Sequence, residues 1–122
     1  MSQILREIQV NIPFTMLYES YLPKFLEYGV NPEIGFDAAA LDRFSMKDFE
    51  GVARQIRKQG LSTTLHAPYL DLSPGSLDSA IRSLTRNRFQ QILELIPIFE
   101  PKTVVCHTGY DHKRYWGLKE MW

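Results

Sequence analysis

Two histidines lie at the ends of two strand-like runs of the sequence. His66 closes the apolar part of LSTTLHAP, and His107 closes that of KTVVCHTG. Pro68 and Gly109 follow within two residues, so regular strand pairing ends close to both imidazoles. A neutral imidazole can bind a divalent metal ion or transfer a proton near neutral pH. Either ring alone could equally be a buried structural histidine, but equivalent positions on consecutive strands favour a shared site.

Three further side chains are expected at the same site. Alternate residues of a strand face the same side, which places Asn11 on the polar side of EIQVNIP and Asp37 on that of EIGFD. Tyr69 lies in the loop that follows His66. Asp37 could instead cap the following turn, and Tyr69 could instead pack its own loop. We predict that Asn11, Asp37 and Tyr69 bind substrate, and that His66 and His107 line the pocket or transfer protons.

Four strand-like runs alternate with helix-like segments, which is typical of an α/β protein with a parallel sheet and right-handed crossovers. β-branched runs predict strands near 7–13, 33–37, 61–66 and 102–107. Apolar residues at three- or four-residue spacing predict helices near 15–28, 45–59 and 77–97.

Single residues refine these boundaries. Pro23 is expected to start, kink or shorten the first helix. Ser45 and Ser76 are the candidate N-caps of the second and third helices, and AAALD after Asp37 is interpreted as a loop. The third helix is expected to turn one apolar face inward, formed by Ala80, Ile81, Leu84, Phe89, Ile92, Leu93 and Ile96.

One side of the predicted strands is polar. It carries Gln9, Asn11, Glu33, Asp37, Thr64, His66 and His107. A parallel sheet covered on both faces would be almost continuously apolar, whereas a barrel lumen opening into a site tolerates polar groups. A (β/α)8 barrel takes about 250 residues, and this chain has 122. We therefore predict a parallel (β/α)4 half of a TIM barrel: a single, partial domain over residues 1–122, truncated at its C-terminal side. The alternative is a complete small α/β sheet.

Composition excludes several other classes. The net charge is zero, from 14 basic and 14 acidic residues, which gives no broad attraction to nucleic acid or anionic membrane. The single cysteine, Cys106, allows no intrachain disulfide and is expected to face the helices and be inert. No apolar run reaches the roughly 18 residues of a membrane span, and a cytoplasmic location is expected. The sequence contains no GxGxxG, GxxxxGK[ST], CxxC or GxSxG motif.

At LHAPYLDLSP and VVCHTGYD the sequence resembles the xylose isomerase-like TIM barrel superfamily. That superfamily joins sugar phosphate isomerases and epimerases with the endonuclease IV-like apurinic-site nucleases (AP endonuclease family 2). The resemblance covers the whole chain as the first four βα units. It implies that His66 and His107 match the first two motif histidines, which are zinc ligands in the nuclease branch and line the pocket in the isomerase branch. In the isomerase branch, a divalent cation (Mn, Mg or Zn) and the acid/base carboxylates belong to the second half of the barrel.

We therefore expect the N-terminal half of a metal-dependent sugar (phosphate) isomerase or epimerase that acts on a small sugar or keto-sugar by proton transfer. The fragment itself should be inactive and hold no metal tightly. One alternative is a zinc-dependent apurinic-site endonuclease with His66 and His107 as metal ligands, although the loops after the strands are acidic and disfavour nucleic acid. Another is a non-catalytic half barrel that self-associates through its open sheet edges.

Overall fold

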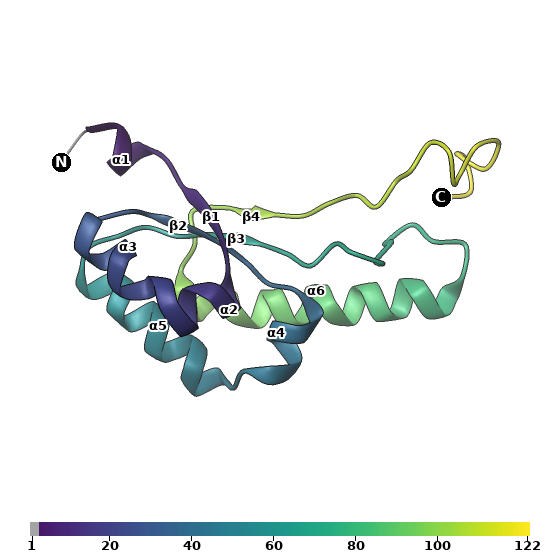
Figure 1. Cartoon of the computed structure of the whole chain (residues 1–122). Coiled ribbons are helices and arrows are strands. Elements are labelled where there is room, and N and C mark those ends of the chain that lie inside the picture. The colour runs from purple at the N-terminus through teal and green to yellow at the C-terminus, as the bar shows by residue number, and fades with distance from the viewer. Residues whose placement is uncertain (1–2) are drawn as a thin grey trace.

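The computed structural model describes residues 3–122 and contains one parallel sheet of four strands in the order β1-β2-β3-β4. The strands are β1 (Val10–Pro13), β2 (Pro32–Gly35), β3 (Thr64–His66) and β4 (Val104–Val105). The helical elements are α1 (Gln3–Glu7), α2 (Phe14–Met16), the π-helical η1 (Leu17–Tyr21), α3 (Leu22–Tyr28), α4 (Ala38–Arg43), α5 (Met46–Lys58) and α6 (Ser79–Phe99). Helices α3, α5 and α6 cover one side of the sheet (Figure 1). The predicted α/β class and parallel strand order are confirmed.

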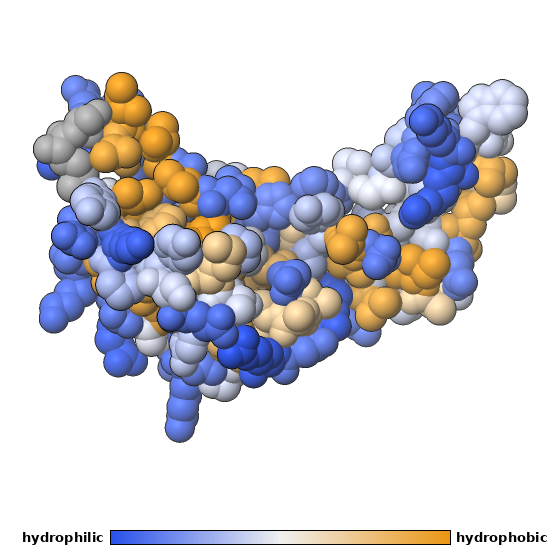
Figure 2. Space-filling model, in the orientation of Figure 1, coloured by the Kyte–Doolittle hydropathy of each residue, from blue (hydrophilic) through white to orange (hydrophobic). Residues whose placement is uncertain are grey.

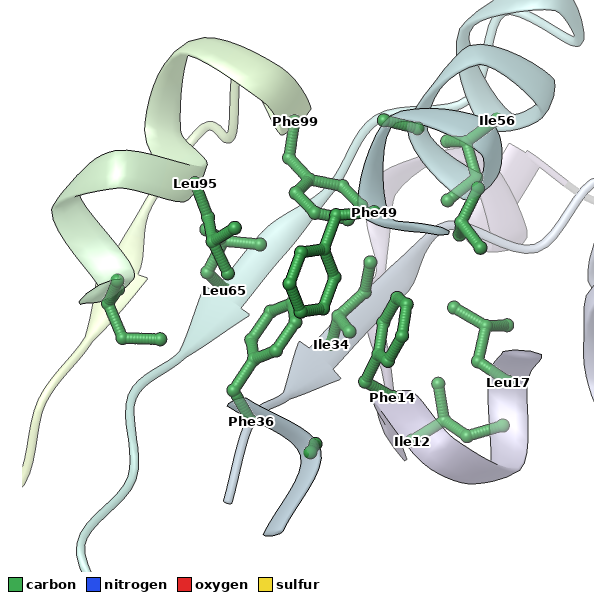
Figure 3. Close-up of a cluster of buried hydrophobic side chains, with 14 of the residues drawn as sticks. Ile12, Phe14, Leu17, Ile34, Phe36, Phe49, Ile56, Leu65, Leu95 and Phe99 are labelled. Carbon is green, nitrogen blue, oxygen red and sulfur yellow. The ribbon is translucent and has the colours of Figure 1, made fainter. Parts of the chain in front are cut away.

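The core lies between the sheet and these helices. Ile12, Ile34 and Leu65 are in register across the first three strands, and each is at most 6% exposed. Phe14 is fully buried, and its ring contacts those of Phe36, Phe49 and Phe99 (Figure 3). It also contacts the rings of Tyr18 and Phe44. Apolar side chains thus gather on one side of the strands, which leaves the other side free to carry polar groups.

The helix predicted over 15–28 is divided into α2, η1 and α3. Pro23 lies in the first turn of α3, where a missing N–H costs little. The π-helical turn directly before it widens the backbone where an α-helix would need the proline N–H. Gly29 ends the helix with a positive φ of 63°, as a C-terminal glycine does.

Two other helix predictions are wrong in detail. The AAALD segment is not a loop, because it forms most of α4. Ser76 is not the N-cap of α6: Asp78 caps it, its carboxylate accepting from the Ala80 N–H, and Ser76 Oγ accepts from the Asp78 N–H. By contrast, Ser45 caps α5 as predicted, in a capping box with Asp48.

The inward face of α6 also differs from the prediction. Thr85, Ile92, Leu95 and Phe99 are buried, whereas Ile81, Leu84 and Leu93 are 38%, 49% and 54% exposed. The amino-terminal half of α6, which carries Ile81 and Leu84, projects past the ends of the strands and has no sheet to pack against (Figure 1). Over residues 3–122, none of the helices combines the length and apolar character that crossing a membrane requires. The cytoplasmic location stays a prediction.

Candidate functional site

A cavity of about 630 Å³ opens at the carboxyl ends of the strands. All five residues predicted for the site line it: Asn11, Asp37, His66, Tyr69 and His107. The carboxyl ends of parallel strands meet at one edge of a sheet, so residues far apart in the sequence converge there. The upper outline of the molecule is hollowed on the side opposite the helices (Figure 2).

The two histidines face each other directly. The Nε2 atoms of His66 and His107 are 3.1 Å apart, with ring centroids at 4.9 Å. His66 Nδ1 lies 3.0 Å from the Ala67 carbonyl oxygen, which can only accept, so Nδ1 carries the proton. In neutral His66 the Nε2 atom therefore has a free lone pair, and His107 Nε2 donates to it. With His66 in this tautomer, the 3.1 Å contact requires His107 Nε2 to carry the proton between the two rings, both of which line the cavity.

Tyr69 completes this group of rings. Its ring stacks on His107 with centroids 4.3 Å apart and planes 13° from parallel, and it meets His66 edge-on at 5.5 Å. Tyr69 is 51% exposed, so it presents aromatic surface to the cavity as well as to its neighbours. The Leu72 N–H donates to the Tyr69 carbonyl at 3.1 Å, which closes the chain into a tight turn after β3.

Polar side chains pair across the strands on the cavity side of the sheet. Asn11 and Glu33 are register partners, and Asn11 Nδ2 donates to Glu33 Oε1 at 2.8 Å. Further down the same side, Gln9 Nε2 donates to Ser62 Oγ at 2.9 Å. The alternation of polar and apolar residues read from the sequence thus corresponds to two different faces of the sheet.

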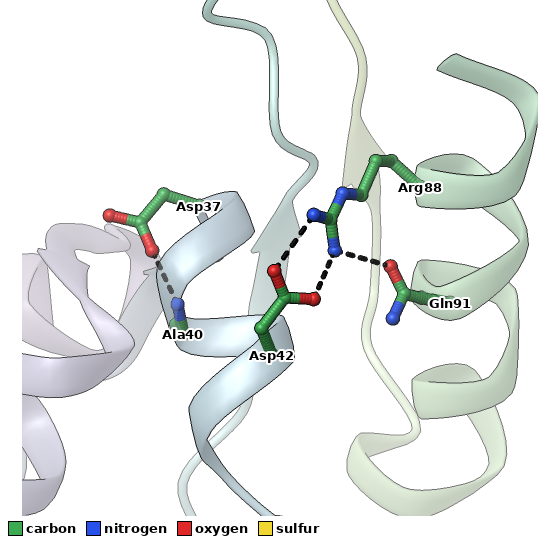
Figure 4. Close-up of polar contacts among 5 residues, drawn as sticks. All are labelled: Asp37, Ala40, Asp42, Arg88 and Gln91. Carbon is green, nitrogen blue, oxygen red and sulfur yellow. Dashed lines mark hydrogen bonds and ion pairs between the residues drawn. The ribbon is translucent and has the colours of Figure 1, made fainter. Parts of the chain in front are cut away.

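Asp37 caps α4, with Oδ1 accepting from the Ala40 N–H at 2.7 Å (Figure 4). Helix α4 is itself held to α6, because the Arg88 guanidinium donates to both carboxylate oxygens of Asp42. The hydrogen bond from Arg88 holds the pKa of Asp42 below its usual value. Ala38 and Ala39, the first two residues of α4, line the cavity together with Asp37.

Sequence reasoning missed the apolar part of the lining, which includes Phe36, Ala38, Ala39, Leu70 and Leu72. These residues follow directly after β2 and β3, and that position is the feature of the sequence from which they could have been predicted. Cys106 is exposed, contrary to our expectation that helices cover it, because β4 ends at Val105 and Cys106 lies beyond the sheet. The roles predicted for the five polar residues stay predictions.

The described residues do not by themselves form a metal centre. Over residues 3–122, no three His, Cys, Asp or Glu side chains converge to hold a metal ion. His66 and His107 offer two nitrogen ligands, whereas a protein zinc site normally has three or four protein ligands.

No protein-family model matches the sequence, and no curated protein matches it. Solved structures do. One is the TTHB071 protein from Thermus thermophilus, from crystals soaked with ZnCl2, with a TM-score of 0.73 and 23% identity. Another is a D-tagatose 3-epimerase-like protein, with a TM-score of 0.63 and 19% identity. Each match covers 93% of this chain, but only 47% and 43% of the respective solved chain.

Over 93% of its length the chain shares its fold with about half of each of these two solved chains. The predicted parallel (β/α)4 half barrel is confirmed. The fold agrees with the resemblance read from the two histidine motifs, and at these identities the likeness extends to the fold alone. The chain spans about half the length of the structures it matches.

Proposed function

We propose that this chain forms the first half of the pocket of a sugar (phosphate) isomerase- or epimerase-like enzyme that acts on a small sugar or keto-sugar by proton transfer. The observation that carries the proposal is the facing pair of Nε2 atoms, 3.1 Å apart, in the lining of the cavity. Its volume of about 630 Å³ falls within the range of small-molecule pockets, roughly 300–1,000 Å³. The similarity to an epimerase-like structure supports the same class.

The residues suit a polyhydroxylated ligand. A sugar hydroxyl can both donate and accept, so a hydroxyl that enters between the two Nε2 atoms and replaces their hydrogen bond would meet one donor and one acceptor. Tyr69 adds a half-exposed aromatic face, against which the C–H side of a sugar ring can pack. The Asn11 side chain lies at the cavity wall with a carbonyl oxygen able to accept.

Turnover requires groups beyond these. We assign the divalent cation (Mn, Mg or Zn) and the acid/base carboxylates to the second half of the barrel, because two imidazoles make too small a ligand set here. The cation would supply a Lewis acid that polarises the substrate carbonyl. The 122-residue chain alone should therefore bind a sugar weakly without converting it, and should hold no metal ion tightly.

Ligand-observed NMR tests this proposal. Saturation-transfer signals from D-tagatose or D-fructose should be present with the wild-type chain and lost with His66→Ala and His107→Ala. His112→Ala is the matched control, since His112 is exposed and lies outside the cavity lining. Equal signals from all four proteins would refute the site. Ketose epimerisation by the wild-type chain alone would refute the assignment of catalysis to the other half.

A zinc-dependent apurinic-site endonuclease is the second candidate. Two nitrogens bound to one tetrahedral zinc ion at about 2.0–2.1 Å lie roughly 3.3 Å apart, close to the observed 3.1 Å. The similarity to a structure from ZnCl2-soaked crystals points the same way. Against it, Asp37 and Asp71 line the cavity and would repel phosphate. Binding of an oligonucleotide with an abasic site, lost on His66→Ala, would favour the nuclease, whereas sugar binding without oligonucleotide binding would favour the isomerase.

A further inference from the structure

The segments that follow β3 and β4 stay in contact well beyond the sheet. His66 meets His107, and Tyr69 stacks on His107. Further along, Gly109 approaches the backbone of Leu72 and Ser73. Figure 1 shows both segments leaving the strand ends and running toward the amino-terminal end of α6. The cavity wall is thus one side of a longer interface between two loops.

Ser73 is the centre of this interface and is only 3% exposed. Its N–H donates to Thr85 Oγ1 on α6 at 2.9 Å. Its hydroxyl lies 2.9 Å from Tyr115 Oη and accepts from Trp122 Nε1 at 3.3 Å. One small residue therefore joins its own loop to α6 and to two aromatic residues near the end of the chain.

Two glycines allow the segments to approach this closely. A Cβ on Gly75 would lie 2.5 Å from Cε2 and 2.6 Å from Cδ2 of Trp122, closer than non-bonded carbon atoms can approach. A Cβ on Gly109 would lie 2.9 Å from the Leu72 carbonyl oxygen and 3.1 Å from the Ser73 Cα, both of which are backbone atoms. Gly109 also has a φ of 72°, which residues with side chains rarely adopt. The spacing of the two segments therefore depends on the absence of side chains at both positions.

Tyr69 is not held in place by burial. It is 51% exposed, and the next residue, Leu70, is 78% exposed. What constrains it is the turn from Tyr69 to Leu72, which continues directly into the buried Ser73. Long loops without such anchors sample many conformations, and a half-exposed ring on one would not keep a single stacking partner.

We propose that residues 109–122, the positioning arm, fix the geometry of the pocket. By docking on Ser73 and Gly75, the arm anchors the turn that carries Tyr69 and holds the Tyr69 ring against His107. Gly109 and Ser73 are positioning residues, since neither lines the cavity. The arm acts on pocket geometry whichever ligand the cavity takes, so the assignment does not rest on the proposed sugar chemistry.

A pair of glycine variants tests the arm. Gly109 and Gly117 both have positive φ, 72° and 75°, so alanine imposes a similar backbone strain at either position. Only Gly109→Ala introduces a collision, because a Cβ at Gly117 meets nothing within 4 Å. The readout is the NMR signals of the His107 ring protons, which the stacked Tyr69 ring shields. Tyr69→Leu supplies the reference position without that shielding.

Gly109→Ala should move the His107 signals toward those of Tyr69→Leu, and Gly117→Ala should leave them at the wild-type position. Unchanged His107 signals in folded Gly109→Ala would overturn the proposal. If Gly109→Ala does not fold, as judged by circular dichroism, Trp122→Phe decides, because it removes the donor to Ser73 and keeps an aromatic ring. Its control is Trp116→Phe, at a residue 78% exposed. If the His107 signals of Trp122→Phe stay at the wild-type position, the proposed role of the positioning arm is also refuted.

Discussion

Thr85→Val should destabilise the chain although it leaves no cavity. Thr85 is fully buried in α6, and its hydroxyl accepts from the Ser73 N–H at 2.9 Å. Valine has nearly the same shape but no acceptor, so this N–H would remain buried without a partner. An unsatisfied buried donor costs about 1–3 kcal/mol. At roughly 4 °C per kcal/mol for a chain of this size, the melting temperature should fall by about 4–12 °C.

Thr85→Ser is the matched control, because serine keeps the acceptor and removes one methyl group, worth about 0.8 kcal/mol. Stability would be measured by urea unfolding, with an unchanged m-value showing that the folded and unfolded states stay equally compact. Hydrogen exchange of the Ser73 amide separates the two variants further. Its protection should be lost in Thr85→Val and kept in Thr85→Ser. If the Ser73 amide stays protected in Thr85→Val and stability is unchanged, the hydrogen bond does not anchor the loop.

Three other predictions concern the fold and its edges. Phe14→Ala should lower the free energy of unfolding by about 3–5 kcal/mol, because it empties the centre of the aromatic cluster. The loss would be measured as a lower midpoint of guanidinium unfolding, and a loss below about 1 kcal/mol would contradict that packing. The chain should sediment as a dimer, because within residues 3–122 the edge strands β1 and β4 each pair on one side only. Val10→Lys should shift the equilibrium toward monomer, and a wild-type chain that stays monomeric at all concentrations would count against this prediction. The pKa of Asp42 is lower in the folded state than its unfolded-state pKa of about 3.9. Ionised Asp42 therefore contributes its full stabilisation above the unfolded-state pKa, and this contribution is lost as pH falls through the folded-state pKa. Asp42→Asn should flatten that acid dependence of the melting temperature, and an unchanged profile would show that the ion pair with Arg88 contributes nothing.

Much of the candidate site could be predicted because it depends on local rules. The ends of strands can be read from β-branched runs and the prolines and glycines that follow, and parallel topology brings those ends together. His66, His107, Asn11 and Asp37 were found in this way, and all four line the cavity. Tyr69 was found only as a loop residue, and its stacking on His107 had no signal in the sequence.

Other features depend on contacts that periodicity does not encode. The sequence of α4 is short and rich in alanine, and the helix is stabilised by an aspartate cap and by Arg88, 46 residues away from Asp42. The apolar residues of α6 have helical spacing throughout, but burial is concentrated in the carboxyl-terminal half, which packs against the sheet. Whether Ile81 is covered depends on where the strands end, which is a property of the assembled molecule.

The sequence by itself determined the alternation of strands and helices, the two faces of the sheet and the placement of two histidines at one edge. These follow from local backbone preferences and from the period of apolar residues. Only the tertiary structure decided that the two Nε2 atoms face each other, that Ser73 joins Thr85 to Tyr115 and Trp122, and that Gly109 must lack a side chain. The hydrogen bonds among these residues join positions 12 to 49 apart in the sequence, so their distances are set by packing and register rather than by local backbone preference.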